Sequence, residues 1–532
     1  FAESIFLKDR IINWDSAKKW IKKDRRQTQR IESLPAGNWI QFFLNEDGMA
    51  SINYESLSAV FPDISSVDPR SFSLYMSQEF GRSRTQNTNQ DIPENLVEIG
   101  IIVNGEEDGS FEPGDKIIFY GRGPSGFDIV GSEIDWHQNV YFISNSCWLL
   151  IPDDSLERGK RIVQTDEPQS ISLTLDYGIS FYHFESDLIN LEASGTQWVG
   201  SPILAGGSQT ILTSLPNPKT GVEAIVTARF LGFSLSDTES ARHIVSLMHN
   251  SLSGDQIGST LNWLGSGSRT IIDDSPNLTL NDGSNVFYIR NTSTDGNSSP
   301  YLDYFEIQYG RELQFSDTYE FTSPISSQDL RFTISGTPSS TEMLWDISDI
   351  ENPANVSISA SGTIDVIIPS NTKSRFILFD SDDLASISEL TLKEDQEFNS
   401  VRQTAIQVDY MIIGPEQFRD EAADLIELRR PAIYVALEAV YDEFSAGNED
   451  PMAIRSFIQW TQENWLSPQP TILLLLGDGG YDYRNITGNS SIVVPTVQVQ
   501  GSRTYATDDR FATLYGNIPE IALGRFPARN EN

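Results

Sequence analysis

Hydrophobic and polar residues alternate in short runs through the first part of the chain. From Gly37, the hydrophobic residues Trp39, Phe42 and Leu44 lie among polar neighbours, and residues 45–48 (Asn-Glu-Asp-Gly) interrupt the run as a hairpin turn would. The pattern predicts a β-rich N-terminal domain over about residues 1–190, with a strand and a short helix expected before Arg30. Further strands are predicted at residues 72–75, 96–103, 116–120, 140–144 and 147–151.

The alternation continues over residues 195–400, where the turns are rich in Ser, Thr, Gly and Asn. Many strands with few helical stretches are typical of sandwich-like packing of sheets. We therefore expect a β-sandwich-like middle domain. Its strands are predicted at residues 224–230, 268–272, 285–289, 304–309, 330–334, 363–368 and 375–380.

The pattern changes after residue 405, where apolar runs at residues 409–413, 432–437 and 471–476 alternate with helical segments. The last run reads Thr-Ile-Leu-Leu-Leu-Leu, which only a strand covered on both faces can bury. Strands that alternate with helices predict a parallel sheet, with a fourth strand at residues 520–523. We therefore expect an α/β domain over residues 405–532.

Two segments of this domain have the spacing of amphipathic helices. The first covers residues 417–430, and the second begins at Asp450-Pro451, which supply an N-cap and a first-turn proline. The residues that share a face are Phe418, Ala422, Leu425 and Leu428 in the first helix, and Ile454, Phe457, Ile458, Thr461 and Trp465 in the second.

Length and composition narrow the class of protein. A chain of 532 residues is long enough for about three to five domains. Its 37 Lys and Arg residues against 75 Asp and Glu residues give a net charge of −38, which repels phosphate backbones and anionic lipid and so argues against nucleic-acid binding. With 39% hydrophobic residues, global disorder is excluded. No apolar run of about 18 residues exists, so no transmembrane segment is expected.

Cysteine and histidine are scarce. Cys147 is the single cysteine, which excludes an intrachain disulfide and a multi-cysteine metal site. It lies in a strand-like stretch, and we interpret it as a small buried hydrophobe rather than a nucleophile paired with His137. The other histidines, His183, His243 and His249, are also interpreted as structural, since His243 and His249 are not spaced for joint metal binding on one helical face.

Candidate chemistry lies where the parallel strands end, because ligands of open parallel sheets bind beyond the carboxyl ends of the strands. Residues 477–483 (Gly-Asp-Gly-Gly-Tyr-Asp-Tyr) and 524–529 (Gly-Arg-Phe-Pro-Ala-Arg) follow two of them. Glycines there would let backbone N–H groups face an oxyanion, and Asp478 and Asp482 could orient a base or hold a cation. The alternative is that the glycines only form a tight turn between strand and helix.

A second candidate is a cation-binding loop over residues 104–115. Oxygen-bearing side chains stand at positions 1, 3, 5, 9 and 12 of this stretch, with Gly109 at position 6, as in loops that bind Ca²⁺. The alternative is an ordinary acidic turn between two strands. The five candidate ligands are Asn104, Glu106, Asp108, Glu112 and Asp115.

Several ordered motifs resemble the gingipain family of cysteine peptidases, and the layout is similar to the sortases of the bacterial type IX secretion system. The family implies a caspase-like α/β domain in which a histidine after the buried strand activates a cysteine after the next one. A thiol needs such an imidazole neighbour because it is mostly protonated at neutral pH. The motifs lie at residues 427–430, 433–437, 440–447, 450–457, 473–482, 507–509 and 521–527, and upstream at 67–70, 96–99, 109–115 and 118–121.

The chain departs from the family at both catalytic positions. The expected histidine position is Gly479 and the expected cysteine position is Ala528. Three interpretations stay open. The domain has lost or replaced the thiol mechanism and serves as a scaffold that recognises cargo; or carboxylates such as Asp478, Asp482 or Asp508 act in another way; or the chain is incomplete and the missing residues follow Asn532. We favour the first.

The resemblance also implies a cellular setting. It predicts an extracytoplasmic protein, in the periplasm or at the cell surface and outer membrane, that processes or handles exported proteins with C-terminal signals and contacts an outer-membrane partner protein. A non-catalytic surface binding protein or adhesin is the alternative. The family assignment requires residues 471–476 and 520–523 to run parallel and side by side, so that Gly479 and Ala528 lie close together.

Overall fold

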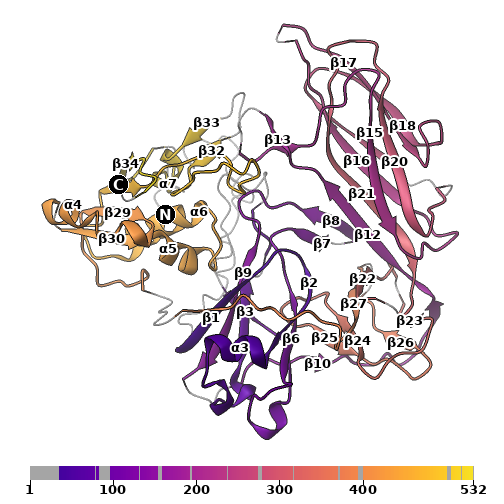
Figure 1. The fold of residues 1–532 in the computed structure, drawn as a ribbon, viewed down its shortest axis with the longest axis horizontal. Helices are drawn as coiled ribbons and strands as arrows, with labels where there is room; N and C mark the ends of the chain where they lie inside the picture. Colours follow the sequence, from indigo (N-terminus) through magenta and orange to yellow (C-terminus); the bar gives the residue numbers. More distant parts are fainter. Residues whose placement is uncertain are drawn as a thin grey trace, which may run out of the picture. The chain divides into compact units, whose positions relative to one another are not determined.

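The computed structural model describes residues 35–530 except 78, 83–95, 131, 154–157, 192–194, 237, 274–277, 316, 327, 370–371, 394–399, 430, 500–504 and 517 (Figure 1). The strand and helix predicted before Arg30 lie outside these residues. The predicted fold class, β-rich domains followed by an α/β domain with a parallel sheet, is confirmed.

Two sheets enclose the core of the N-terminal part. The first has the order β28-β1-β9-β3-β4, and the second has the order β2-β6-β5. Ile40, Phe42, Ile52, Phe119 and Cys147 are fully buried in this core. The strands are β1 (Gly37–Leu44), β3 (Ser73–Ser77), β4 (Leu96–Ile99), β9 (Asn145–Pro152) and β28 (Thr391–Lys393), with β2 (Gly48–Asn53), β5 (Ile102–Asn104) and β6 (Lys116–Gly121); helix α3 (Tyr54–Val60) follows β2.

Three local predictions for this part are wrong. Residues 45–48 do not close a hairpin, because β1 pairs with β9 and β28 whereas β2 pairs with β6 in the other sheet. Residues 96–103 form two strands that belong to different sheets. Residues 140–144 form no strand. Instead, Val140, Tyr141 and Phe142 are buried as a small cluster next to Tyr483, so these hydrophobic residues pack in a core without forming the hydrogen bonds of a sheet.

The middle part is a sandwich of a nine-stranded sheet and a four-stranded sheet, as predicted. Its core joins Phe305 and Ile307 of the larger sheet to Leu247 and Phe287 of the smaller one. The larger sheet has the order β10 (Val163–Gln164), β25 (Ala354–Val356), β24 (Glu342–Asp346), β27 (Arg375–Asp380), β22 (Tyr319–Thr322), β12 (Tyr177–Glu185), β21 (Tyr301–Glu312), β16 (Ile225–Leu231) and β19 (Ser268–Asp273); the smaller has β15 (Ser208–Leu215), β20 (Gly283–Asn291), β17 (Arg242–His249) and β18 (Asp255–Leu264).

Shorter strands complete this part. A three-stranded sheet, β11 (Leu173–Leu175), β23 (Leu330–Thr333) and β26 (Thr363–Val366), shares a core with β22, β24 and β27. β7 (Gly126–Val130) and β8 (Glu133–His137) form a hairpin, and β13 (Ile189–Asn190) pairs with β14 (Trp198–Val199). Strand pairing joins β12 to β21 and β1 to β28 across the predicted boundaries. The division at residues 1–190 and 195–400 stays a prediction.

The α/β part, orange to yellow in Figure 1, is built on four parallel strands in the order β30-β29-β31-β34. Leu473 and Leu475 of β31 pack on one face, and Leu474 and Leu476 pack on the other. The run is therefore covered on both faces, as its composition predicts. The strands are β29 (Tyr410–Gly414), β30 (Ala432–Ala436), β31 (Ile472–Leu476) and β34 (Ala522–Phe526).

Helices α5 (Leu437–Phe444) and α6 (Met452–Asn464) cover one face of this sheet, and the predicted stripe is buried, with Trp465 at the C-cap just after α6. The other face is covered by the 3-10 turn η6 (Glu416–Phe418) and helix α4 (Ala423–Leu428). The predicted helix over residues 417–430 is thus shorter, and Leu428 is 75% exposed, since the sheet already ends at β30. Helix α5 has no counterpart among the predicted elements. No described helix is long and apolar enough to cross a membrane.

Candidate functional site

A groove of about 550 Å³ lies beyond the carboxyl ends of β31 and β34. Its other wall is a hairpin of β32 (Val497–Val499) and β33 (Tyr505–Thr507), which was not predicted. Of the predicted site residues, Asp478, Gly479 and Asp508 line it. The remaining lining residues are Gly480, Tyr481, Thr496, Gln498, Tyr505, Ala506, Thr507 and Arg525.

The loops after β31 and β34 run side by side, as the family assignment requires. The strands pair in parallel from Ile472 with Ala522 to Leu476 with Phe526. Two backbone hydrogen bonds continue the pairing into the loops: Gly477 N donates to Phe526 O at 2.9 Å and Asp478 N to Ala528 O at 2.8 Å. The segments around Gly479 and Ala528 are therefore held together at the end of the sheet.

The space beside Gly479 is filled. A Cβ atom placed on Gly479 would lie 2.4 Å from Thr496 Cγ2, much closer than carbon atoms approach without displacement. Gly477, two residues earlier, has a φ of +155° and would meet Val494 Cγ2 at 2.6 Å. Thr496 thus occupies the volume that a larger side chain at position 479 would require.

Arg525 organises the groove, a role that the sequence did not reveal. Nε and Nη2 bind both oxygens of Asp508, at 2.8 and 2.7 Å. Nη1 donates to Gly477 O and Val494 O, at 2.8 and 2.7 Å, and Nη2 also donates to Pro495 O at 3.0 Å. All five N–H groups of the guanidinium are used, so this side chain ties the end of β31 to the segments before β32 and after β33.

The three candidate aspartates have structural partners. Asp478 Oδ2 accepts from Arg529 Nε at 2.6 Å, and its Oδ1 accepts from Gly479 N at 3.0 Å. Asp482 is buried and lies outside the groove lining; it accepts from the backbone N–H groups of residues 486 and 487 and from the Thr487 hydroxyl. Asp508 holds Arg525. Each carboxylate therefore shapes a loop, and this arrangement offers no thiol or imidazole to activate.

Cys147 and the histidines lie in the β-rich parts. Cys147 is fully buried in β9, and burial raises the pKa of its thiol. His137 bonds Gly81 O and stacks on Phe80, and burial lowers the pKa of its imidazole. His243 and His249 stand six residues apart on strand β17, roughly 20 Å at the rise of a strand, too far to share one metal ion.

The predicted calcium loop has its own internal bonds. Glu106 pairs with Arg161 at 2.8 Å, Asp108 accepts from Ser110 N, and Asp115 accepts from Glu112 N. Asn104 ends β5, and Glu112 lies on the exposed turn before β6. Within the described ranges, no three His, Cys, Asp or Glu side chains are grouped so that they could hold a metal ion. Calcium binding would require these carboxylates to turn together, and it stays a prediction.

Comparison with known proteins gives the class. The family model of peptidase family C25 matches residues 403–532, the parallel sheet and its groove. The match is confined to the α/β domain, which therefore resembles the peptidases of family C25, the gingipain family. No curated protein sequence matches the chain.

Among solved structures, the chain resembles dimeric latent PorU from Porphyromonas gingivalis, with a TM-score of 0.74 and 18% identity. The match covers 93% of this chain and 48% of PorU, so the chain spans about half the length of that protein. The N-terminal and middle parts thus share the fold of PorU together with the α/β domain.

Two carbohydrate-binding modules match smaller parts. A CBM36 module in complex with calcium and xylotriose has a TM-score of 0.16 at 18% identity, over 24% of this chain and 98% of the module. A family 35 module from Clostridium thermocellum has a TM-score of 0.16 at 16% identity, over 24% of this chain and 90% of the module. At these TM-scores, neither match informs the function of the chain.

Proposed function

We propose that this chain is a gingipain-family protein of the type IX secretion sortase kind that binds exported proteins in the groove without cleaving them. The observation that carries the proposal is the pair of family positions, Gly479 and Ala528. They lie on loops joined by hydrogen bonds at the end of the parallel sheet, and neither residue has a nucleophile or a base. We infer that the groove corresponds to the peptidase site of the family and has lost its catalytic pair.

The rim of the groove supports a binding role. Tyr481 and Tyr505 are 40% and 58% exposed, and tyrosine side chains combine a large apolar surface with a polar tip. Gln498 and Thr507 add polar groups to the lining of the groove. Such a rim suits an extended peptide, as the C-terminal signal segment of an exported protein would supply.

The proposed setting follows from the same family. We place the chain outside the cytoplasm, in the periplasm or at the cell surface and outer membrane, in contact with exported cargo and an outer-membrane partner protein. The fold of PorU supports this setting, and the net charge of −38 disfavours nucleic acid as a partner.

The test is to incubate the chain with a cargo protein that has its C-terminal signal, and with the same cargo lacking it. We expect binding that depends on the signal and no cleavage by mass spectrometry. Tyr505→Ala should weaken binding about tenfold, whereas Tyr515→Ala, which removes an equally exposed tyrosine outside the groove lining, should not.

Two outcomes would contradict the proposal. Cleavage of the cargo would reject the loss of activity, and its sensitivity to iodoacetamide and to Cys147→Ala would show whether the single thiol is responsible. Equal binding of both cargo forms would favour the alternative of a general surface binding protein or adhesin.

A further inference from the structure

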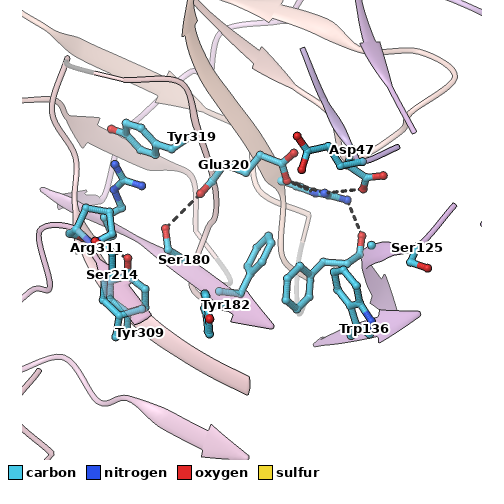
Figure 2. A pocket seen from close by; sticks show the side chains of 17 residues that line it. Asp47, Ser125, Trp136, Ser180, Tyr182, Ser214, Tyr309, Arg311, Tyr319 and Glu320 are labelled. Atoms are coloured by element: carbon cyan, nitrogen blue, oxygen red, sulfur yellow. Dashed lines mark hydrogen bonds and ion pairs between the residues drawn. The ribbon is translucent and has the colours of Figure 1, made fainter. Parts of the chain in front are cut away.

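A second cavity, of about 370 Å³, lies in the β-rich part of the chain, lined by residues of the β7–β8 hairpin and of β12, β21 and β22. Aromatic side chains form part of its wall, among them Phe127, Trp136, Phe181, Tyr182 and Tyr309. Figure 2 shows Arg311, Tyr319, Tyr309 and Ser214 at one end and Asp47, Ser125 and Trp136 at the other.

Arg311 is the unusual residue of this pocket. It lies on β21, is 7% exposed, and its guanidinium carbon lies 3.7 Å from the centre of the Tyr319 ring. Its Nε is buried without a hydrogen-bond partner, and among the described residues no carboxylate forms an ion pair with it. Buried charges in proteins are usually paired with an opposite charge. This guanidinium is therefore expected to bind an anion.

Arg375, which lines the same pocket, shows the contrast. Its guanidinium pairs with Glu320 at 2.6 Å and with Asp47 at 3.3 Å. It also donates to Phe127 O at 2.7 Å and to Tyr120 Oη at 3.0 Å. Asp47 and Glu320 are thus engaged around Arg375, and neither pairs with Arg311, whose charge faces a ligand that enters the pocket.

The lining narrows the chemical class of that ligand. One guanidinium balances one negative charge, and its planar set of N–H groups matches the two oxygens of a carboxylate. Glu46, Asp47 and Glu320 on the same wall disfavour a dianion such as phosphate. The aromatic wall favours an apolar or aromatic body, as in most small-molecule pockets.

We propose that this pocket binds a small monocarboxylate with an aromatic or apolar body, whose carboxylate accepts hydrogen bonds from Arg311. The site is separate from the groove at the end of the parallel sheet and does not depend on the function proposed for that groove. The hydroxyl of Ser214, at the same end as Arg311, supplies a further donor.

The test is isothermal titration of the whole chain with 3-phenylpropionate, and with 3-phenylpropionamide as the uncharged isostere. We expect the carboxylate to bind at least tenfold more tightly than the amide. Arg311→Gln should remove this preference, and Arg311→Lys should retain part of it. Arg331→Gln, which removes an exposed arginine paired with Asp365, is the matched control and should bind as the parent does.

Three results would overturn the proposal: equal binding of acid and amide, unchanged binding in Arg311→Gln, or binding of sulfate or phosphate as tight as that of the carboxylate. If Arg311→Gln does not fold, Ser214→Trp tests the same pocket. The larger side chain would occupy the space of the ligand and leave the guanidinium of Arg311 in place. Binding that survives Ser214→Trp unchanged would likewise reject the site.

Discussion

Arginine side chains carry much of the local order in this acidic chain. Arg525 and Arg375 each join segments that are distant in sequence, through bidentate or networked bonds to carboxylates and carbonyl groups. A guanidinium suits this role because its five donors lie in one rigid plane. The chain has 37 basic and 75 acidic residues, so many carboxylates compete for few cations. The geometry of the fold decides which carboxylates form ion pairs.

Replacement of Arg525 tests its role in the groove. Arg525→Gln should lower the free energy of unfolding by about 3 kcal/mol, because Asp508 and three carbonyl groups lose their donor in a largely buried place. Arg525→Lys should recover only part of this loss. Arg529→Gln, at an arginine that is 68% exposed, should cost less than about 1 kcal/mol, and equal losses in urea unfolding would contradict the assignment.

Asp47 gives a prediction of pH dependence. Burial, opposed by Arg375, raises the pKa of this carboxyl from 3.8 to about 6. Between these values the native state keeps a proton that the unfolded chain has released, so stability falls as the pH rises. Relative to Asp47→Asn, which keeps an acceptor for Gly123 N, the parent should lose up to about 3 kcal/mol from pH 4 to pH 7. Parallel stability curves of the two proteins would contradict this.

At the scale of elements, the positions of the strands in the α/β part follow from the local pattern of apolar residues. The conformations of the loops depend on contacts with segments that are distant in the sequence. β31 alternates between two cores because each of its positions is apolar. The loop after it is shaped by Thr496, from a segment about twenty residues later, which fills the volume beside Gly479. The end of a strand is therefore easier to predict than the site that stands on it.

A double substitution tests the packing at Gly479. Gly479→Ala should destabilise the protein by about 1–3 kcal/mol, because its Cβ meets Thr496 Cγ2 at 2.4 Å. Adding Thr496→Ser removes that methyl group and should restore most of the loss in a thermal melt. Gly524→Ala, whose Cβ would meet no atom within 4 Å, is the control and should be close to neutral. No recovery in the double variant would show that another contact limits the site.

The loop at residues 104–115 gives a prediction on metal binding. If its carboxylates gather around Ca²⁺, millimolar Ca²⁺ should raise the midpoint of thermal unfolding, and Asp108→Ala should abolish the rise. Asp63→Ala, at an exposed aspartate outside the loop, should leave it unchanged. Addition of a chelator should reverse the effect. The absence of any shift in the parent protein would leave the acidic turn as the description of this loop.

At the scale of the whole molecule, the β-rich and α/β parts are joined by buried polar contacts. Arg82 Nε donates to Asp450 Oδ2 at 2.9 Å, and both side chains are at most 5% exposed. Trp148 Nε1 donates to Ala446 O at 3.0 Å, and Ser146 N donates to Asn448 Oδ1 at 2.8 Å. These bonds fix the start of α6 and the turn before it against β9.

Asp450→Asn tests this junction. The variant keeps an acceptor for Met452 N at the start of α6 but loses the ion pair with Arg82. Because the substitution breaks a buried ion pair, we expect a loss of about 3–5 kcal/mol in urea unfolding. Asp365→Asn, which breaks a partly exposed pair with Arg331, should cost less than about 1 kcal/mol. Similar losses in the two variants would mean that the junction adds no more stability than a surface pair.

Some of the structure was already determined by the sequence. The spacing of Ile454, Phe457 and Ile458 predicted the buried face of α6, and the apolar run of β31 predicted a strand covered on both sides. The order of strands and helices predicted the parallel sheet, and with it the meeting of the loops at Gly479 and Ala528. These features follow from periodicity and from the rule that parallel strands end at one edge, which are properties of neighbouring residues.

Tertiary structure alone decided the rest. Asp450 could be predicted as a helix cap, but its second oxygen binds Arg82, which lies 368 positions away. The turn at residues 45–48 joins two sheets, and the five bonds of Arg525 reach three segments of the chain. Among the residues that the structure describes, no carboxylate pairs with Arg311. Each depends on which distant groups surround a side chain once the chain is packed. The free energy of a buried charge is set by those surroundings, and no local pattern of the sequence contains them.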